Sequence, residues 1–297
     1  MKVLVTGSHG LVGTALLESL IANKYQVLRL VRARSTSGTD ISWDPDAGNI
    51  DKEKLEGLDV VFHLAGESIA SGRWNDDKKR RIRESRVRGT QLLANTLVQL
   101  TDRPTTLVSA SAIGYYGDRS DEVLTERSRV GTGFLSEVCV EWEDATTPAS
   151  AAGIRVVLAR FGIILDKKGG ALAKMLPPFR MGIGGRVGDG KQWMSWIALD
   201  DVIAGLQFVA ENRGISGPVN FVAPNPVTNA QFTKSLGRIL SRPTLFPIPA
   251  FGARLAFGEM ADALLLSSQR VEPACLKNEN YSFRFSELNK ALQHILK

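Results

Sequence analysis

The chain has 297 residues, of which 23% are charged, and its formal net charge is +6. This length is enough for one large or two modest domains. No apolar run reaches the roughly 18 residues that a membrane helix needs, and the first residues read as a core strand rather than a secretory leader. We therefore expect a cytoplasmic protein without a membrane segment. The few histidines and the two cysteines, Cys139 and Cys275, form no cluster, which argues against a metal site and indicates buried free thiols.

The N-terminal segment predicts a buried strand, a glycine turn and an amphipathic helix. The apolar run Val3 to Val5 ends in Thr6-Gly7, and glycines follow with the spacing Gly-x-x-Gly-x-x-Gly. Glycines allow a tight turn and let backbone amides approach a phosphate, and the next helix points its N-terminal N–H groups at the same place. The alternative is a glycine turn that serves packing alone. We favour a dinucleotide site, whose residues here are Gly7, Ser8, His9, Gly10, Leu11, Val12 and Gly13.

The second predicted strand, Gln26 to Val31, ends at Arg32, with Arg34 close behind. In a dinucleotide-binding fold this strand end meets the adenosine ribose, where an arginine favours a 2′-phosphate through charge-assisted hydrogen bonds. We therefore expect NADP rather than NAD, although an ordinary surface arginine is the alternative. Residues 35–57 are polar and rich in turn residues, and we expect a long connection there.

Strands and helices continue to alternate. The buried strand over residues 57–66 ends in a tip whose backbone we expect to lie against the cofactor, through Leu64, Ala65, Gly66 and Glu67. Further elements are expected as a helix over 76–100, a strand over 105–110, a helix over 133–151 and a strand over 154–161. This alternation predicts an α/β fold with a doubly wound parallel sheet, a Rossmann domain.

The helix over residues 76–100 begins with a basic run, Lys78–Arg88, which accounts for much of the excess positive charge. Such a run occurs in nucleic-acid-binding proteins, but aromatic residues are not interleaved with this one. Asp76 and Asp77 are placed to pair with Arg80 and Arg81 one helical turn away. We expect a solvated or anion-facing helix surface and no nucleic-acid partner.

Past Gly162 the alternation stops. Residues 166–196 are rich in glycine, residues 197–212 predict a helix, residues 219–222 a strand and residues 229–240 another helix.

We expect two regions: 1–162 with 197–223 as the dinucleotide-binding Rossmann domain, and 163–196 with 224–297 as a smaller α+β region that caps the substrate. Further candidates for contact with an anionic substrate or a phosphate are Arg86, Arg88, Arg186 and Lys191.

These motifs resemble the extended short-chain dehydrogenase/reductase superfamily, which includes nucleotide-sugar epimerases and dehydratases. The resemblance covers most of the chain and rests on Thr6–Gly13, Asp59–Gly66, Arg88–Thr90, Ser109–Ser111 with Tyr116-Gly117, and Asp200–Val202. Other segments resemble one branch, the YfcH-like epimerase family proteins: Trp43–Pro45, Gly66–Ile69 with Trp74, Ser85–Val87, Phe134–Trp142 and Trp193–Ile197. The resemblance implies a nicotinamide cofactor over the carboxyl ends of the strands and a substrate held by the C-terminal region.

The catalytic set of that superfamily is a Ser or Thr, a Tyr, and a Lys four residues after the Tyr. A phenol with a pKa of about 10 needs a nearby cation to act as a base at neutral pH. Ser111 matches the serine, but Phe134 and Val138 occupy the positions of the pair, and nowhere in the chain does a Tyr precede a Lys by four residues. Because neither side chain transfers a proton, the usual mechanism does not carry over.

Two hypotheses remain. In the first, the chain is an NADP-dependent epimerase or oxidoreductase that acts by hydride transfer on a small, anionic, nucleotide- or sugar-based substrate. Ser111 and a loop tyrosine, Tyr116 or Tyr115, then orient or protonate the substrate oxygen, unless these tyrosines only pack; Glu67 and Glu137 are other acid/base candidates. In the second, the chain is a non-catalytic NADP-binding or regulatory module on an epimerase scaffold. The sequence leaves open whether it is a monomer or a homodimer.

Overall fold

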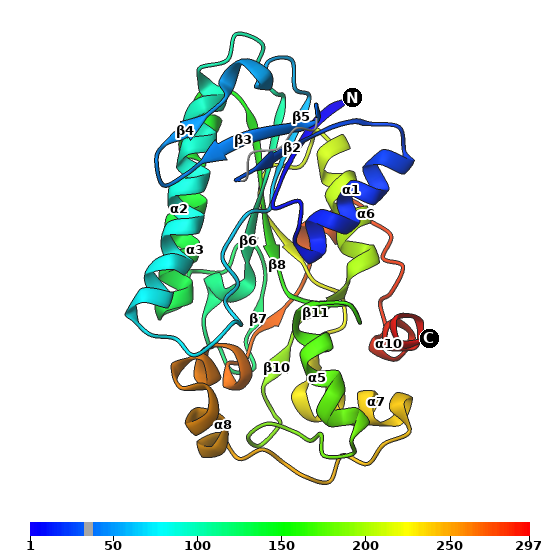
Figure 1. Cartoon of the computed structure of the whole chain (residues 1–297). Coiled ribbons are helices and arrows are strands. Elements are labelled where there is room, and N and C mark those ends of the chain that lie inside the picture. Colours follow the sequence, from blue (N-terminus) through cyan, green and yellow to red (C-terminus); the bar gives the residue numbers. More distant parts are fainter. Residues whose placement is uncertain (33–37) are drawn as a thin grey trace.

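An eight-stranded sheet organises the computed structural model, which describes residues 1–32 and 38–297 (Figure 1). The strand order is β12-β8-β6-β5-β1-β2-β3-β4, and every pairing in it is parallel except that of β3 with β4. The strands are β1 (Lys2–Thr6), β2 (Gln26–Val31), β3 (Asp40–Asp44), β4 (Asn49–Ile50), β5 (Val60–His63), β6 (Thr106–Ala112), β8 (Arg155–Phe161) and β12 (Gly217–Phe221). From β1 the chain first adds strands toward one edge of the sheet, through β2 to β4, and then toward the other edge, through β5 to β12. This is the doubly wound arrangement that the alternation of strands and helices predicts.

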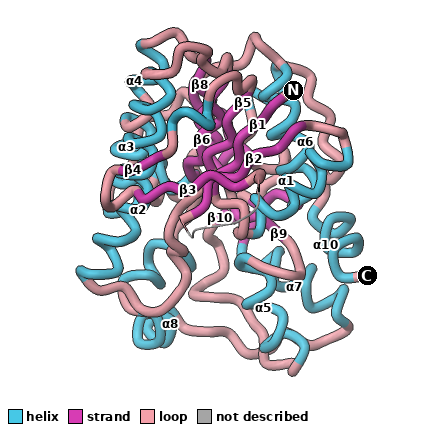
Figure 2. Tube along the Cα trace, turned by 45° about the horizontal axis from the view of Figure 1, so that its top comes forward, coloured by secondary structure: helices cyan, strands magenta, loops and turns pink. Residues whose placement is uncertain are grey.

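Helices cover both faces of this sheet (Figures 1 and 2). One face carries α1 (Leu11–Ala22) and α6 (Leu199–Glu211), and the other carries α2 (Asp76–Val98), α3 (Phe134–Asp144) and α4 (Thr147–Ala151). Alternate residues of the strands enter the two layers: Val60 and Phe62 pack under α1 and α6, whereas Val61 packs against α2. Burial on both faces explains why these strands read as continuous apolar runs.

A second group of elements lies beyond the carboxyl ends of the strands (Figure 2). Its helices are α5 (Gly170–Arg180), α7 (Asn229–Leu240), α8 (Ala250–Phe257) and α10 (Leu288–Leu296), whereas α9 (Ala274–Asn278) buries Leu276 in the core of the main sheet. Short strands complete it: β7 (Val123–Leu124), β9 (Ile163–Leu165), β10 (Trp193–Met194), β11 (Trp196–Ala198), β13 (Val227–Thr228) and β14 (Arg270–Val271). A separate hydrophobic cluster, which includes Trp196 and Phe232, joins α5, α7 and α10. The division of the chain into two domains stays a prediction.

Three expectations about local structure need correction. The connection over residues 35–57 contains β3, β4 and the short 3-10 helix η1 (Lys52–Leu55), because the alternating Ile41 and Trp43 bury their side chains against the core. The helix expected over residues 133–151 is two helices, since Pro148 cannot continue the hydrogen-bonding of α3 and instead lies in the first turn of α4. The helix after residue 197 begins at Leu199, because Trp196–Ala198 pairs with β9.

Candidate functional site

The glycine turn forms the first wall of the site. Gly7 has a φ of +67°, and a side chain there would meet the Leu64 carbonyl, because its Cβ would lie 2.5 Å from that oxygen. A Cβ on Gly13 would lie 2.2 Å from the carbonyl oxygen of Gly7. The turn therefore brings bare backbone close to the tip of β5 and lets α1 start directly behind it.

An unpartnered hydroxyl lies inside this turn. Ser8 is 4% exposed, and its Oγ has no hydrogen-bond partner among the described residues. The following N-cap position of α1, Gly10, offers no side-chain cap for the first amides of the helix. A buried hydroxyl beside uncapped helix N–H groups is a set of unused donors at a positive helix end, which suits a phosphate group.

A buried histidine fixes the two strand tips relative to each other. Thr6 Oγ1 accepts hydrogen bonds from the amides of Leu64 and Ala65, at 3.0 and 3.1 Å, so its proton points to Nδ1 of His63 at 2.8 Å. His63 Nε2 then donates to Thr90 Oγ1 of α2, also over 2.8 Å. Burial lowers the pKa of His63 to about 4, so the ring is neutral. This chain of bonds holds β1, β5 and α2 in register beneath the site.

The two ends of the predicted cofactor site carry charged side chains. Arg32 is exposed directly after β2, while Arg34 lies outside the described residues. Glu67, past the tip of β5, accepts a hydrogen bond of 2.6 Å from Lys78 Nζ, which also donates to Ser71 Oγ. The bond from Lys78 lowers the pKa of Glu67, so the carboxyl is ionised at neutral pH and is no proton donor.

Two of the predicted catalytic residues lie in a closed buried network. Ser111 is 1% exposed and donates to Glu143 Oε1 at 2.6 Å. Glu143 in turn accepts from Nε and Nη2 of Arg160, each at 2.7 Å. Tyr116 has no exposed surface; its hydroxyl accepts from Arg160 at 3.0 Å and donates to Asn220 at 2.8 Å. Burial raises the pKa of Tyr116 to about 12, so a proton transfer from this hydroxyl is unfavourable at neutral pH.

Tyr115 is placed differently from its neighbour. Its side chain is half-buried, and its ring lies 3.5 Å from Arg160 Cζ. No hydrogen bond of the Tyr115 hydroxyl occurs within the described ranges. Of the hydroxyls predicted to be catalytic, this one alone has no hydrogen-bond partner among the described residues.

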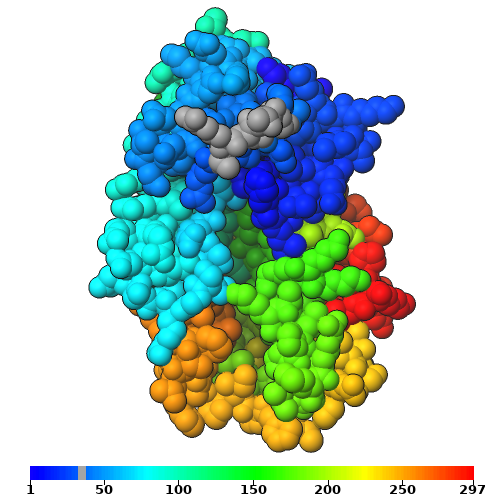
Figure 3. Space-filling model, in the orientation of Figure 1, coloured from blue at the N-terminus to red at the C-terminus, as the bar shows by residue number. Residues whose placement is uncertain are grey.

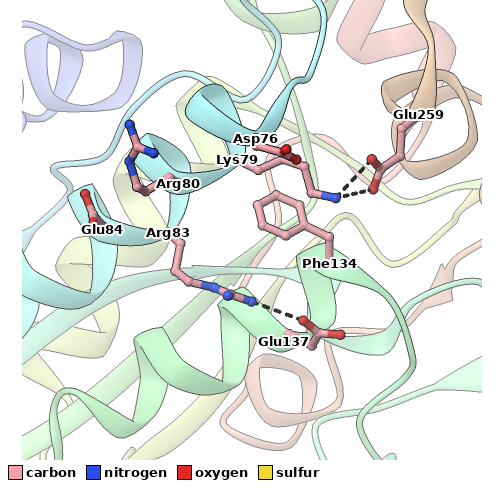
Figure 4. Close-up of a pocket in the computed structure, with 8 residues that line it drawn as sticks. All are labelled: Asp76, Lys79, Arg80, Arg83, Glu84, Phe134, Glu137 and Glu259. Atoms are coloured by element: carbon pink, nitrogen blue, oxygen red, sulfur yellow. Dashed lines mark hydrogen bonds and ion pairs between the residues drawn. The ribbon is translucent and has the colours of Figure 1, made fainter.

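The two altered catalytic positions lie one turn apart on α3 but in different surroundings. Val138 is 2% exposed, in the core. Phe134 packs on Trp74, with a centroid distance of 5.4 Å, and lies between two cations, 4.8 Å from Lys79 Nζ and 5.7 Å from Arg83 Cζ. Phe134, Lys79 and Arg83 line a pocket of about 450 Å³ together with Glu137, whose carboxylate pairs with Arg83 (Figure 4).

The remaining candidates have mostly local partners. Arg88 pairs with Glu84 in its own helix, Arg186 donates to the carbonyl of Asp189, and Lys191 is exposed. Arg86 points back to the tip of β5, where its Nη1 donates to the carbonyl oxygen of Glu67 at 3.0 Å. The sequence did not identify Lys78, Glu143 or Arg160, because their partners lie between 11 and 44 residues away.

A hollow runs down the face that Figure 3 shows, bounded by the blue N-terminal segment, the cyan segment at the start of α2 and the bright green segment that includes α5. Contacts join these walls: Lys174 of α5 donates to the carbonyl of Ala70, and the backbone at Gly169 lies against Leu11. The described helices include none that is both long and apolar enough to cross a membrane. The described residues also contain no group of His, Cys, Asp and Glu that could hold a metal ion.

Two family models match the sequence. The one described as the NAD dependent epimerase/dehydratase family matches residues 3–222, and a domain of unknown function matches residues 248–295. An epimerase family protein of Mycobacterium bovis is 43% identical over 290 residues, which are 98% of this chain and 96% of that protein.

Solved structures are similar as well. The human epimerase family protein SDR39U1, crystallised with NADPH, has a TM-score of 0.91 and 32% identity, and the match covers 99% of each chain. A nucleoside-diphosphate sugar epimerase of Corynebacterium glutamicum has a TM-score of 0.82 and 43% identity, over 100% of this chain and 58% of that one.

Proposed function

Because the chain belongs to the NAD-dependent epimerase/dehydratase family, we propose that it binds NADP(H) at the carboxyl ends of β1, β5 and β6. The unpartnered hydroxyl of Ser8 carries this proposal, because a buried donor without an acceptor at a helix N-terminus fits an anionic ligand. The similarity to a human protein crystallised with NADPH supports the same cofactor.

Different residues of the cleft bind different parts of the cofactor. The first amides of α1 and the Ser8 hydroxyl hold the pyrophosphate, and Arg32 at the end of β2 pairs with the 2′-phosphate. The backbone from Leu64 to Glu67 lies along the nicotinamide half. NAD lacks the phosphate that Arg32 meets, so it binds more weakly.

We further propose that the bound cofactor serves hydride transfer on a small, anionic substrate of the nucleotide-sugar class, held by the C-terminal region. The similarity to a nucleoside-diphosphate sugar epimerase supports this substrate class. Ser111 and Tyr116 are bound to Glu143, Arg160 and Asn220, so their hydroxyls hold the fold together. The proton donor of the reaction is then Tyr115, whose hydroxyl is free among the described residues.

A second candidate function is a non-catalytic NADP(H)-binding module. Phe134 and Val138 favour it, because they remove the usual proton-transfer pair, and so does the engagement of Ser111 and Tyr116.

A turnover experiment separates the two functions. The purified protein is incubated with NADPH or NADP⁺ and a panel of nucleotide sugars and carbonyl compounds, and both absorbance at the nicotinamide band and product mass are followed. Product mass detects an epimerisation that leaves no net change in NADPH. The enzyme hypothesis is supported if the chain turns over a substrate, if Tyr115→Phe lowers that turnover, and if Glu137→Gln leaves it unchanged. Tight NADPH binding with no product from any substrate supports the module.

A further inference from the structure

Most of the exposed apolar side chains are gathered in one part of the surface. Twelve large apolar side chains are exposed among the described residues, and eight of them belong to residues 181–183 and 245–257. The most exposed are Leu245 (76%), Phe251 (73%) and Leu255 (76%). Apolar side chains that are scattered singly over a surface are common, whereas a gathered patch marks a binding surface. These two segments together are the apolar face.

The two segments of the apolar face lie side by side. Nε of Arg242 donates to the carbonyl oxygen of Arg180 at 2.9 Å. Further along, the amide of Ile248 donates to the carbonyl oxygen of Arg186 at 2.8 Å. The second segment leads into α8, and it follows the lower edge of the molecule in Figure 1, at the end opposite the N-terminus. The exposed apolar side chains therefore share one end of the molecule.

Positive charges surround the apolar face. Residues 180–186 and 234–257 contain six arginine and lysine residues and no acidic one. Of these six, Arg254 alone pairs with a carboxylate among the described residues, that of Asp262. The side chain of Arg242 is exposed, like those of the other five. Most of this positive charge is therefore available to an anion outside the chain.

These properties distinguish the possible occupants of the apolar face. A second copy of the chain, related by twofold symmetry, would place the six basic residues near their own copies, and such like-charge contacts are unfavourable. An anionic lipid bilayer is complementary to both parts of the face, because its phosphates attract arginine and its interfacial region takes up leucine and phenylalanine side chains. Side chains as exposed as Leu245, Phe251 and Leu255 project from the molecule, as insertion into a bilayer requires.

We propose that the apolar face binds the surface of an anionic lipid bilayer. Leu245, Phe251 and Leu255 insert into the interfacial region, while Arg238 and Arg242 contact the lipid phosphates. Binding of this kind needs no helix that spans the membrane. The apolar face contains none of the residues assigned to NADP(H), so membrane binding and cofactor binding are tested separately.

Co-sedimentation of the full chain with lipid vesicles measures this binding. Vesicles of phosphatidylcholine alone are compared with vesicles made of equal parts phosphatidylcholine and phosphatidylglycerol. We expect the chain to sediment with the anionic vesicles and to bind the neutral ones roughly 10-fold more weakly or less, because the arginines gain only from anionic lipid. Added salt should release the chain from the anionic vesicles, since it screens exposed charges.

The apolar contribution is tested by the double variant Phe251→Ser with Leu255→Ser. It should weaken binding to anionic vesicles roughly 10-fold or more, because two apolar side chains no longer leave water. The matched control is Ile21→Ser, which removes an apolar side chain that is 64% exposed on α1, and it should leave vesicle binding unchanged. Circular dichroism verifies the fold, which substitutions at such exposed positions should preserve.

The contribution of charge is tested by Arg238→Gln with Arg242→Gln. This double variant should weaken binding to the anionic vesicles roughly 10-fold and leave binding to the neutral vesicles unchanged. Lys52→Gln with Lys54→Gln removes the same charge from η1, away from the apolar face, and is the matched control. It should change neither binding.

The contrary outcomes are equally clear. A wild-type chain that stays in the supernatant with both kinds of vesicle overturns the proposal, and so does equal binding to neutral and anionic vesicles. Vesicle binding that Phe251→Ser with Leu255→Ser leaves unchanged shows that another surface binds lipid. Sedimentation velocity tests the other occupant: a wild-type dimer that the same variant converts into a monomer, without vesicle binding, assigns the apolar face to a second copy of the chain and overturns the proposal as well.

Discussion

Replacing Glu143 by glutamine tests whether the network beneath the site is structural. The Glu143 and Arg160 side chains are 10% and 4% exposed, and two hydrogen bonds of 2.7 Å join them. Glu143→Gln preserves the shape but leaves the charge of Arg160 buried without compensation, and it weakens the acceptor of Ser111. Breaking one partner of a buried ion pair costs about 3–5 kcal/mol. That is a large share of the roughly 5–15 kcal/mol that stabilises a typical domain.

Urea unfolding followed by circular dichroism measures this loss. The matched control is Glu84→Gln, which removes the surface pair with Arg88, where 33% and 55% of the two side chains are exposed. We expect that control to cost about 0.5 kcal/mol or less. The double variant Glu143→Gln with Arg160→Met removes both buried charges and should recover part of the loss. A Glu143→Gln variant no less stable than Glu84→Gln would refute the structural role.

Three further outcomes follow from the site. Arg32→Ala should weaken NADPH roughly 10-fold or more and leave NADH nearly unchanged, because only NADPH has the 2′-phosphate; an equal effect on both, by fluorescence titration, contradicts the cofactor assignment. Tyr115→Phe should lower any turnover by about 100-fold or more while NADPH affinity stays the same. An unchanged kcat would mean that Tyr115 only packs. The third outcome concerns pH: His63 has a pKa of about 4 in the folded chain and 6.5 as its ordinary value, so the unfolded state takes up the proton first. Stability should therefore fall as the pH drops from 6.5 toward 4, by up to about 3 kcal/mol, and His63→Gln should remove this part of the pH dependence in thermal melts.

Much of the fold could be predicted from the sequence because its signals are local. The strand from Gln26 to Val31 ends where the apolar run ends, and the helix that begins at Asp76 starts where the helical pattern starts. The structure confirms both. The glycine turn is also recognisable from the spacing of its three glycines. In the structure, a Cβ on any of the three would lie close to backbone atoms. Strand β3 was missed because its few alternating residues follow a polar stretch and depend on tertiary packing of Trp43.

The interior of the site could not be predicted in the same way. Ser111 near the end of β6 and Tyr116 shortly after it match a catalytic pattern in the sequence, and only their distant partners Glu143, Arg160 and Asn220 reveal that both hydroxyls are engaged. Nothing in a sequence distinguishes Arg86, which turns toward β5, from Arg88, which pairs with a neighbour on the helix surface. Such distinctions depend on side-chain direction relative to the rest of the fold.

The most direct measurement of the central claim is a calorimetric titration of the purified chain with NADPH and, separately, with NADH. We expect NADPH to bind one site per chain in the micromolar range or tighter and NADH to bind at least about 10-fold more weakly, as the loss of the contact between Arg32 and the 2′-phosphate requires. Failure of NADPH to bind at millimolar concentration, or equal affinities for the two cofactors, would contradict the account.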